Sequence, residues 1–223
     1  LVFPESTKLV QPAKENGNGN VISGSSDIFD AIGNAGYYWT ADGPDGYGSY
    51  INGRLRYRPL SFLEGKGLLG ISAYGSAVNG EAGKNSDPYH KRAWTVGPTA
   101  KMYFKGADLT ADLGFGQVNE FGRGYDEART VFSPFMWYSN YGRRLEGKPW
   151  LAKTEVGLGM VIPLSSGERD MRTGQLFFNQ WIYDKKFNKD VMLSTGLQAG
   201  LGYDKGGKGY NFYQLGPAVS LQY

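Results

Sequence analysis

Apolar residues alternate with small or polar residues along most of this chain, and this alternation limits what it can fold into. Within 210–223, Leu215 and Leu221 fall on one parity while Gln214 and Ser220 fall on the other. Residues two apart share a face of a β-strand, so such a segment has one apolar and one polar face. The pattern recurs between turn-forming stretches and predicts ten strands. Their expected ranges are 34–42, 47–60, 67–79, 92–104, 108–121, 128–141, 149–164, 173–184, 190–203 and 210–223.

The polar face identifies which kind of β protein this is. It carries charges and glycines, such as Asp112, Glu155, Gly157 and Gly159. A soluble barrel fills its interior with bulky side chains, which this face could not supply. The apolar face therefore suits lipid and the polar face suits a lumen, as in transmembrane barrels. The sequence predicts an all-β fold: a closed antiparallel transmembrane β-barrel of about ten strands, spanning 33–223. A soluble, lipocalin-like binder is the fold alternative.

Composition supports the barrel and excludes several kinds of site. The 34 glycines among 223 residues are roughly double the average share of about 7%. No apolar run approaches the ~20 residues of a membrane helix. With no cysteine and one histidine, neither a thiolate site nor a multi-histidine metal site is possible, and no cofactor is expected. The net charge of +3 comes without a basic stripe, so nucleic acid is not an expected partner.

Residues 1–32 differ from the rest of the chain, because they are rich in Asn, Gly, Ser and Lys and poor in aromatics. We expect an N-terminal extension there that lies in the periplasm, plugs the lumen or binds a protein partner. If the chain ends at the periplasmic rim, an even strand count places this extension on the periplasmic side. The sequence thus predicts an extension over 1–32 and a barrel over 33–223.

The last strand ends on an aromatic residue, Tyr223, preceded by apolar residues at alternate positions. This ending resembles the C-terminal signal of bacterial outer-membrane β-barrel proteins. The resemblance implies a Gram-negative outer membrane, surrounding lipid and lipopolysaccharide, and assembly machinery that reads the last strand. Residues 54–60 and 215–223 are also similar to C-terminal barrels of exopolysaccharide-export and phage-adsorption proteins. That second resemblance is confined to two segments, and no function is transferred from it.

Charged residues on the predicted inner faces lie at similar distances from the periplasmic turns. This charged belt consists of Arg54, Arg56, Arg58, Lys101, Asp112, Lys153 and Glu155. A lipid-facing charge would cost a few kcal/mol at mid-depth, so an inward direction is favoured. We expect Arg54 and Arg56 within ion-pair reach of Asp112 or Glu155. Two interpretations stay open: a salt-bridge network that closes a narrow barrel, or an anion-selective constriction, because positive groups outnumber carboxylates.

Aromatic residues gather near the predicted strand ends, which is typical of interfacial girdles. The girdle candidates are Trp94, Trp137, Trp150, Trp181, Tyr203 and Tyr223. We expect Trp150, Trp181 and Tyr223 at the periplasmic interface; sugar stacking on outer loops is the alternative role for such aromatics. The lumen glycines either leave interior space or permit strand curvature. Pro98, Pro134, Pro163 and Pro217 fall inside predicted strands, where we expect them to mark bulges.

The single histidine, His90, is predicted in an outer loop with Ser86 and Asp87 close in sequence. A histidine there could act as a general base in an outer-membrane lipid acylase or protease. The paired-acid patterns of barrel proteases are absent, and a solvated loop histidine is the simpler interpretation. We therefore expect a non-enzymatic, porin-like envelope barrel: a narrow pore, an anchor, or a transport subunit of an export or surface assembly. The His90 enzyme is the alternative.

Overall fold

The computed structural model describes residues 28–40, 47–63, 66–82, 87–104, 107–122, 125–140, 153–167, 171–187, 191–205 and 210–223. Ten strands make up the fold. They are β1 Phe29–Thr40, β2 Tyr47–Phe62, β3 Gly67–Ala82, β4 Asp87–Phe104, β5 Ala107–Gly122, β6 Tyr125–Asn140, β7 Lys153–Pro163, β8 Thr173–Lys186, β9 Met192–Asp204 and β10 Tyr210–Gln222. No helix among these residues is long and apolar enough to cross a membrane.

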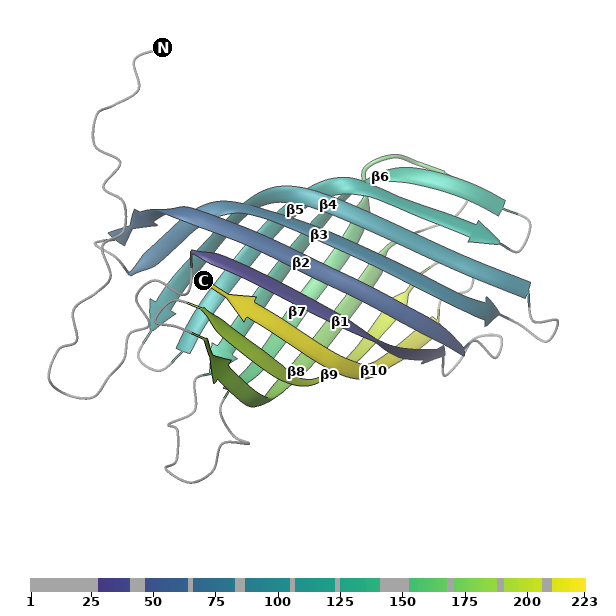
Figure 1. Ribbon diagram of the computed structural model, residues 1–223. Helices are drawn as coiled ribbons and strands as arrows, with labels where there is room; N and C mark the ends of the chain where they lie inside the picture. The colour runs from purple at the N-terminus through teal and green to yellow at the C-terminus, as the bar shows by residue number, and fades with distance from the viewer. Residues whose placement is uncertain are drawn as a thin grey trace, which may run out of the picture.

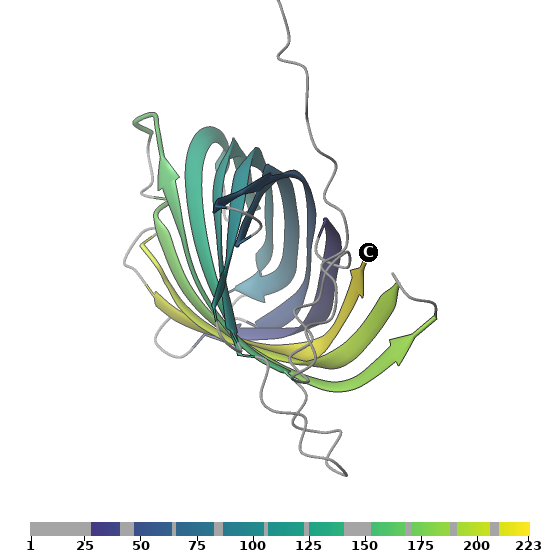
Figure 2. The same ribbon diagram turned by 90° about the vertical axis from the view of Figure 1, so that its left-hand side faces the viewer.

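Every strand pairs antiparallel with its sequence neighbours, and β1 pairs with β10, so the sheet closes on itself (Figures 1 and 2). The backbone of Phe29 exchanges two hydrogen bonds of 2.8 Å with Tyr223 at this seam. The predicted closed ten-stranded antiparallel barrel is confirmed. Closure leaves no sheet edge along the seam, which is the structural advantage of a barrel.

The first strand begins earlier than the sequence suggested. We predicted a start at 34, whereas β1 runs from Phe29 and therefore includes Asp30 and Ile32. The alternation is weak at residues 29–33, because the apolar Ile32 shares the parity of Asp30, and the segment upstream is polar. The difference matters because it places the Asp30 carboxylate inside the barrel, where it is 5% exposed.

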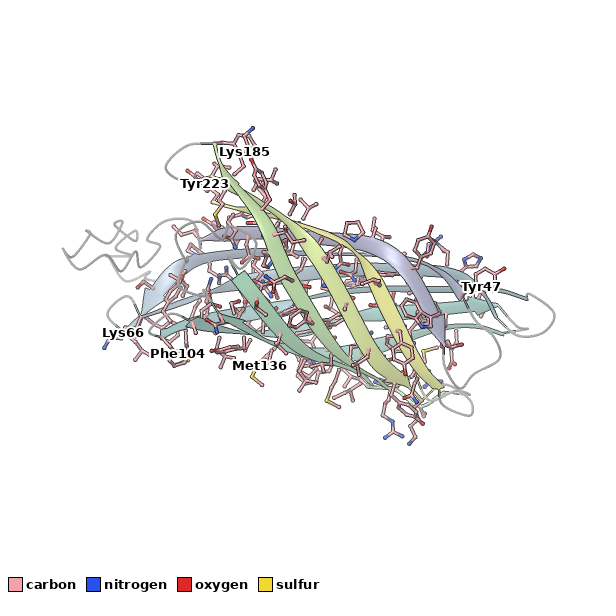
Figure 3. The ribbon with its side chains drawn as sticks, turned by 90° about the horizontal axis from the view of Figure 1, so that it is seen from below. Tyr47, Lys66, Phe104, Met136, Lys185 and Tyr223 are labelled. Atoms are coloured by element: carbon pink, nitrogen blue, oxygen red, sulfur yellow. The ribbon has the colours of Figure 1, made fainter. Side chains whose placement is uncertain are left out.

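The two faces of the sheet separate as predicted. Along β10, Leu215 is 49% exposed while Ser220 and Gln222 are 2% and 7% exposed. The same holds on β5, where Phe115 is exposed and Asp112 is buried. Apolar side chains thus project outward and polar ones inward, and Figure 3 shows the outward side chains around the wall.

Strand β8 carries aromatic residues on both faces, so the sequence alone does not identify which face points outward. Phe177 and Trp181 point inward and are buried, whereas Phe178 is outward and exposed. The pairing of β8 with β9 shifts register between Trp181 and Tyr183. Because of this bulge, the consecutive residues Ile182 and Tyr183 are both exposed.

The prolines do not behave as expected. The β4–β5 register is unchanged across Pro98, since Val96 pairs with Phe115 and Thr99 with Asp112. The register is also unchanged across Pro134 and Pro217, where pairing is interrupted toward β7 and toward β1, respectively. Pro163 is the last residue of β7. The bulge prediction was wrong for these four prolines. A proline without an N–H can leave a ladder gap without adding a residue. A different proline, Pro59, does lie at an irregularity, because the β2–β3 pairing shifts register between Tyr57 and Leu60.

The barrel has two rims, which we name by the residues at them. Lys66, Phe104, Lys185 and Tyr223 lie at one end, the C-terminal rim, and Tyr47 lies at the other, the opposite rim (Figure 3). His90 pairs with Asn79, two residues before the partner of Tyr47, and therefore lies near the opposite rim. His90 and Tyr223 are thus at opposite ends, as the predicted strand count requires.

Candidate functional site in the lumen

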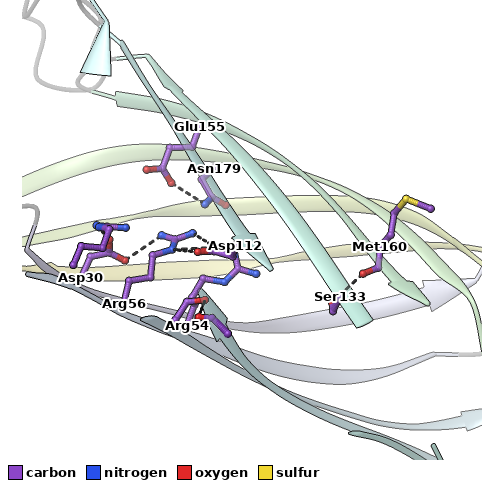
Figure 4. Close-up of polar contacts among 11 residues, drawn as sticks. Asp30, Arg54, Arg56, Asp112, Ser133, Glu155, Met160 and Asn179 are labelled. Carbon is purple, nitrogen blue, oxygen red and sulfur yellow. Dashed lines mark hydrogen bonds and ion pairs between the residues drawn. The ribbon is translucent and has the colours of Figure 1, made fainter. Parts of the chain in front are cut away.

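Arg56 on β2 connects two distant strands through its guanidinium group. Its Nη1 lies 3.1 Å from Oδ1 of Asp30 on β1, and its Nη2 lies 2.9 Å from Oδ2 of Asp112 on β5. Its Nε also donates to Asp112, at 3.1 Å from Oδ2. All three side chains are nearly fully buried, and Figure 4 shows Arg56 between the two carboxylates. Charge-assisted contacts of this forked kind fix both geometry and charge.

Further ion pairs extend this layer around the wall. Arg58 pairs with the second oxygen of Asp30, and Lys101 Nζ lies 3.1 Å from Oδ2 of Asp108. We call the set the charged layer. It consists of Asp30, Arg54, Arg56, Arg58, Lys101, Asp108, Asp112 and Glu155.

The charged layer is balanced, with four basic and four acidic members among the described side chains. Among these side chains positive groups do not outnumber carboxylates, and the expected excess, which counted Lys153, stays a prediction. The sequence reasoning missed Asp30, which it placed in the extension, and Asp108, which it placed at the very start of a strand. Lys153 begins β7, but its side chain lies outside the described residues.

Glu155 has different surroundings from the other carboxylates. It accepts hydrogen bonds from Nδ2 of Asn179 at 3.1 Å and from Oγ of Ser139 at 3.3 Å. Gln198 in turn donates to Oδ1 of Asn179 at 2.7 Å. The expected reach of Arg54 and Arg56 to carboxylates is thus seen at Asp112. Glu155 instead contacts Asn179 (Figure 4), which in turn contacts Gln198 on β9.

Arg54 joins the charged layer to a group of aromatic rings. Its Nη1 lies 3.3 Å from Oδ2 of Asp112, and its guanidinium carbon lies 4.3 Å from the centroid of the Phe135 ring. The same carbon lies 5.1 Å from the ring centroids of Tyr74 and of Trp137. Trp137 stacks on Phe177 at 5.8 Å between centroids. This aromatic layer, Tyr74, Phe135, Trp137 and Phe177, places rings from β3, β6 and β8 inside the barrel.

The aromatic layer corrects two girdle predictions. Trp137 is 8% exposed and Trp181 is 1% exposed, so both lie on the inner face and neither faces outward. Trp137 shares the parity of the inward residue Ser139, and the β8 bulge separates Trp181 from the outward Tyr183. Trp94, Tyr203 and Tyr223 do face outward, and Tyr223 lies at the C-terminal rim. Trp150 lies outside the described residues.

Glycines on β7 make room for these rings. A Cβ atom added at Gly157 would lie 2.5 Å from the Trp137 ring, and one added at Gly159 would lie 2.1 Å from the Phe135 ring. Both distances are far below van der Waals contact. Glycine at these two lumen positions therefore leaves room for aromatic side chains. The sequence analysis considered only empty interior space and strand curvature as roles for these glycines.

A second set of contacts crosses the lumen nearer the opposite rim. Lys91 Nζ on β4 lies 2.5 Å from Oδ2 of Asp204 on β9, 113 residues away in sequence. The same nitrogen lies 3.3 Å from Oγ1 of Thr173 and 3.9 Å from Oε1 of Glu120. We name this the upper ion pair, Lys91–Asp204. Sequence reasoning did not predict it, because the two residues are joined only by the curvature of the barrel.

The hydrophobic residue Met171 lies beside this upper region. It precedes β8 and is 0% exposed, packed against Val118, Val131 and Val161. Backbone N–H of Lys205 donates to the carbonyl of Arg172 at 2.9 Å. The chain entering β8 is thus held against the inner wall.

We predicted His90 in an outer loop, but it lies on β4. Its parity matches the outward residues Trp94 and Val96, and its Nδ1 lies 2.9 Å from Oδ1 of Asn79. Ser86 and the side chain of Asp87 lie outside the described residues. Among the described residues, no group of three or more His, Cys, Asp or Glu could hold a metal ion.

Comparisons with known proteins give little beyond the architecture. No protein-family model matches the chain, and no curated protein matches it either. Among solved structures, the transport unit of the autotransporter AIDA-I from Escherichia coli is similar, with a TM-score of 0.45 and 13% sequence identity. The similarity covers 92% of each chain. The barrel assignment rests on the strand pairing described above.

Proposed function

We propose that this chain is a non-enzymatic outer-membrane β-barrel that is closed by its own side chains. It would serve as an anchor or as a structural subunit of an export or surface assembly. The observation that carries the proposal is the position of Arg54, which reaches from β2 to Asp112 on β5 and to the Phe135 ring on β6. A side chain in that position occupies the space through which a solute would pass.

The membrane location is supported by the outward face. Leu55, Leu158 and Leu201 are each more than half exposed, and every strand carries exposed large hydrophobic residues on this face. Exposing this much apolar surface to water is unfavourable, whereas lipid accommodates it. The charges of the middle of the barrel point inward, away from where lipid would be.

The closed lumen is supported by contacts at two levels. Arg54 and Arg56 connect β2 to β1, β5 and β6, while the upper ion pair connects β4 to β9. An anion-selective constriction needs cationic groups in excess, and the charged layer has four of each sign. Paired charges of this kind brace a narrow barrel and leave little field to attract ions.

The proposed partners follow from location and sequence. Outer-membrane lipid and lipopolysaccharide would surround the wall, and the barrel assembly machinery would read the strand β10. Of the predicted extension 1–32, the part before Phe29 would reach a protein partner on the side of the C-terminal rim, since Phe29 and Tyr223 pair there. The His90 enzyme is less favoured, because the imidazole faces outward and contacts the amide of Asn79.

Membrane insertion can be tested by tryptophan quenching in vesicles whose lipids carry brominated acyl chains. Two single-tryptophan variants are compared, one retaining only Trp94 and the other only Trp137, with the remaining tryptophans replaced by Phe. Trp94 is 52% exposed on the outer wall and Trp137 is 8% exposed inside. We expect strong quenching of Trp94 and weak quenching of Trp137. Equal quenching in a folded barrel, or none at Trp94, would contradict the proposed orientation.

A further inference from the structure

A cavity of about 50 Å³ lies in the lumen between the aromatic layer and the upper ion pair. Its lining includes Tyr74 and Phe135 of the aromatic layer and Lys91 and Asp204 of the upper ion pair. By the usual allowance of about 10–15 Å³ per enclosed water, it has room for roughly three to five water-sized groups. It is larger than the space of about 20 Å³ that remains in the charged layer beside the C-terminal rim.

The walls of the cavity are mainly aromatic and aliphatic. Tyr38, Tyr50 and Phe212 form one buried cluster on the inner face, with the Tyr38 and Phe212 ring centroids 5.9 Å apart. Val118 and Val161 line another part of the wall. Apolar walls with a few fixed polar groups are the usual composition of small-molecule sites.

Two polar atoms at this cavity lack a hydrogen-bond partner among the described residues. They are the hydroxyl oxygen of Tyr50 and Oε1 of Gln214, on side chains that are 3% and 7% exposed. Both residues line the cavity. Buried polar atoms are normally paired, so an unpaired hydroxyl and an unpaired amide oxygen beside one cavity indicate a missing partner. The partner must donate a hydrogen bond to Gln214, because its Oε1 only accepts.

The charges at the cavity limit the ligand further. Lys91 and Asp204 are 2.5 Å apart and satisfy one another, so neither demands an ionic ligand. A ligand that donates and accepts hydrogen bonds, is uncharged, and offers C–H surface to aromatic rings has the chemistry of a polyhydroxy compound.

We propose that the cavity between the aromatic layer and Lys91–Asp204 binds a small uncharged polyhydroxy molecule, a polyol or one end of a sugar. Its hydroxyl groups would pair with Tyr50 and Gln214, and its carbon skeleton would pack on Tyr38 and Phe212. This inference goes beyond the anchor role and does not depend on it, because a closed barrel and a conducting one could each hold such a ligand.

Saturation-transfer NMR and isothermal titration on the folded full chain test the proposal. A polyoxyethylene detergent is used, since sugar-based detergents would compete for the site. The probes are glycerol, glucose, galactose and N-acetylglucosamine. We expect saturable binding of at least one of them, with one site per chain. Binding of glycerol alone would identify a polyol site, and binding of the hexoses would identify a sugar site; either outcome supports the proposal.

Tyr50→Phe and Gln214→Leu each remove one hydrogen-bonding group and keep most of the side-chain volume. Loss of one hydrogen bond should weaken binding by roughly two- to tenfold in each variant. Tyr57→Phe, on the same strand but 52% exposed on the outer wall, is the matched control and should bind normally. Heat-modifiable gel mobility checks that every variant is folded. No saturable binding by folded wild type, or binding that neither variant weakens, would overturn the proposal and leave a cavity that holds water only.

Discussion

The guanidinium group of Arg54 lies over the ring of Phe135, with its central carbon 4.3 Å from the ring centroid. The two residues belong to β2 and β6, which are separated by three strands in one direction around the barrel and by five in the other. An arginine held against an aromatic face and a carboxylate at once loses its freedom to move aside. This contact links the charged layer to the aromatic layer, and in the proposed function it closes the lumen.

Replacing Arg56 should destabilise the barrel strongly. Arg56→Ser leaves the buried carboxylates of Asp30 and Asp112 without their shared partner. Breaking a buried pair in this way costs about 3–5 kcal/mol. Urea unfolding in lipid vesicles, followed by tryptophan fluorescence, measures the loss. Lys66→Ser, at the exposed C-terminal rim, is the control and should change stability little. Equal effects of the two substitutions would argue against the bracing role.

Gly157→Ala should destabilise the barrel by about 1–3 kcal/mol, the usual effect of overpacking. The new Cβ would lie 2.5 Å from the Trp137 ring, which would have to move. Gly75→Ala is the matched control, because its added Cβ would meet nothing nearer than 4.0 Å. A smaller residue at position 137, as in Trp137→Leu, should recover part of the loss in the Gly157→Ala background. Absence of any recovery would mean that the glycine serves strand geometry instead.

Removing one partner of the upper ion pair should destabilise the barrel more than removing both, as expected for buried charges. Lys91→Met strands the carboxylate of Asp204 and should lower the unfolding free energy by about 3–5 kcal/mol. The double variant Lys91→Met, Asp204→Leu removes both charges and should be much nearer to wild type. Thermal unfolding in detergent of Lys91→Met, Asp204→Leu and the double variant gives the comparison. If the double variant were as unstable as the sum of its single changes, the pair would not act as a unit.

His90→Ala should leave the barrel and its envelope role unchanged. The side chain sits on the outer face with Asn79 as its neighbour, and surface substitutions of this kind usually fall within about 0.5 kcal/mol. Unfolding curves and assays for lipid deacylation and peptide cleavage check both points. A hydrolytic activity that disappears in this variant would favour the enzyme alternative.

The strand pattern could be predicted from the sequence because alternation is a local property. The outward direction of Leu215 and the inward direction of Ser220 follow from the alternation of the residues next to them. The same local alternation identifies the two faces of β5, β7 and β9. Trp181 could not be placed, because β8 carries aromatic residues and an amide on both faces; it shares the inward parity of Phe177 and Asn179, and the β8 bulge lies after it. The inward direction of Trp137 could have been predicted, because Trp137 has the same parity as Ser139. The girdle prediction rested instead on its position near a strand end.

The lumen contacts were harder to predict. The reach of Arg54 and Arg56 to Asp112 followed from parity and depth, since all three lie at similar distances from the turns of one rim. Asp30 was missed because its strand begins inside a polar stretch. Lys91 and Asp204 are 113 residues apart and meet only because the barrel closes at a particular register. Such pairs depend on strand tilt and shear, which no local pattern encodes.

Single-channel recording in planar lipid bilayers tests the closed lumen most directly. The wild-type barrel is inserted from detergent, and insertion is verified by co-sedimentation with vesicles of the same lipid. Because Arg54, Arg56 and the upper ion pair occupy the lumen at two levels, we predict no stable conductance steps at moderate voltage. Reproducible open channels in the folded wild type, with a preference for anions, would contradict the account and establish the charged layer as a pore constriction.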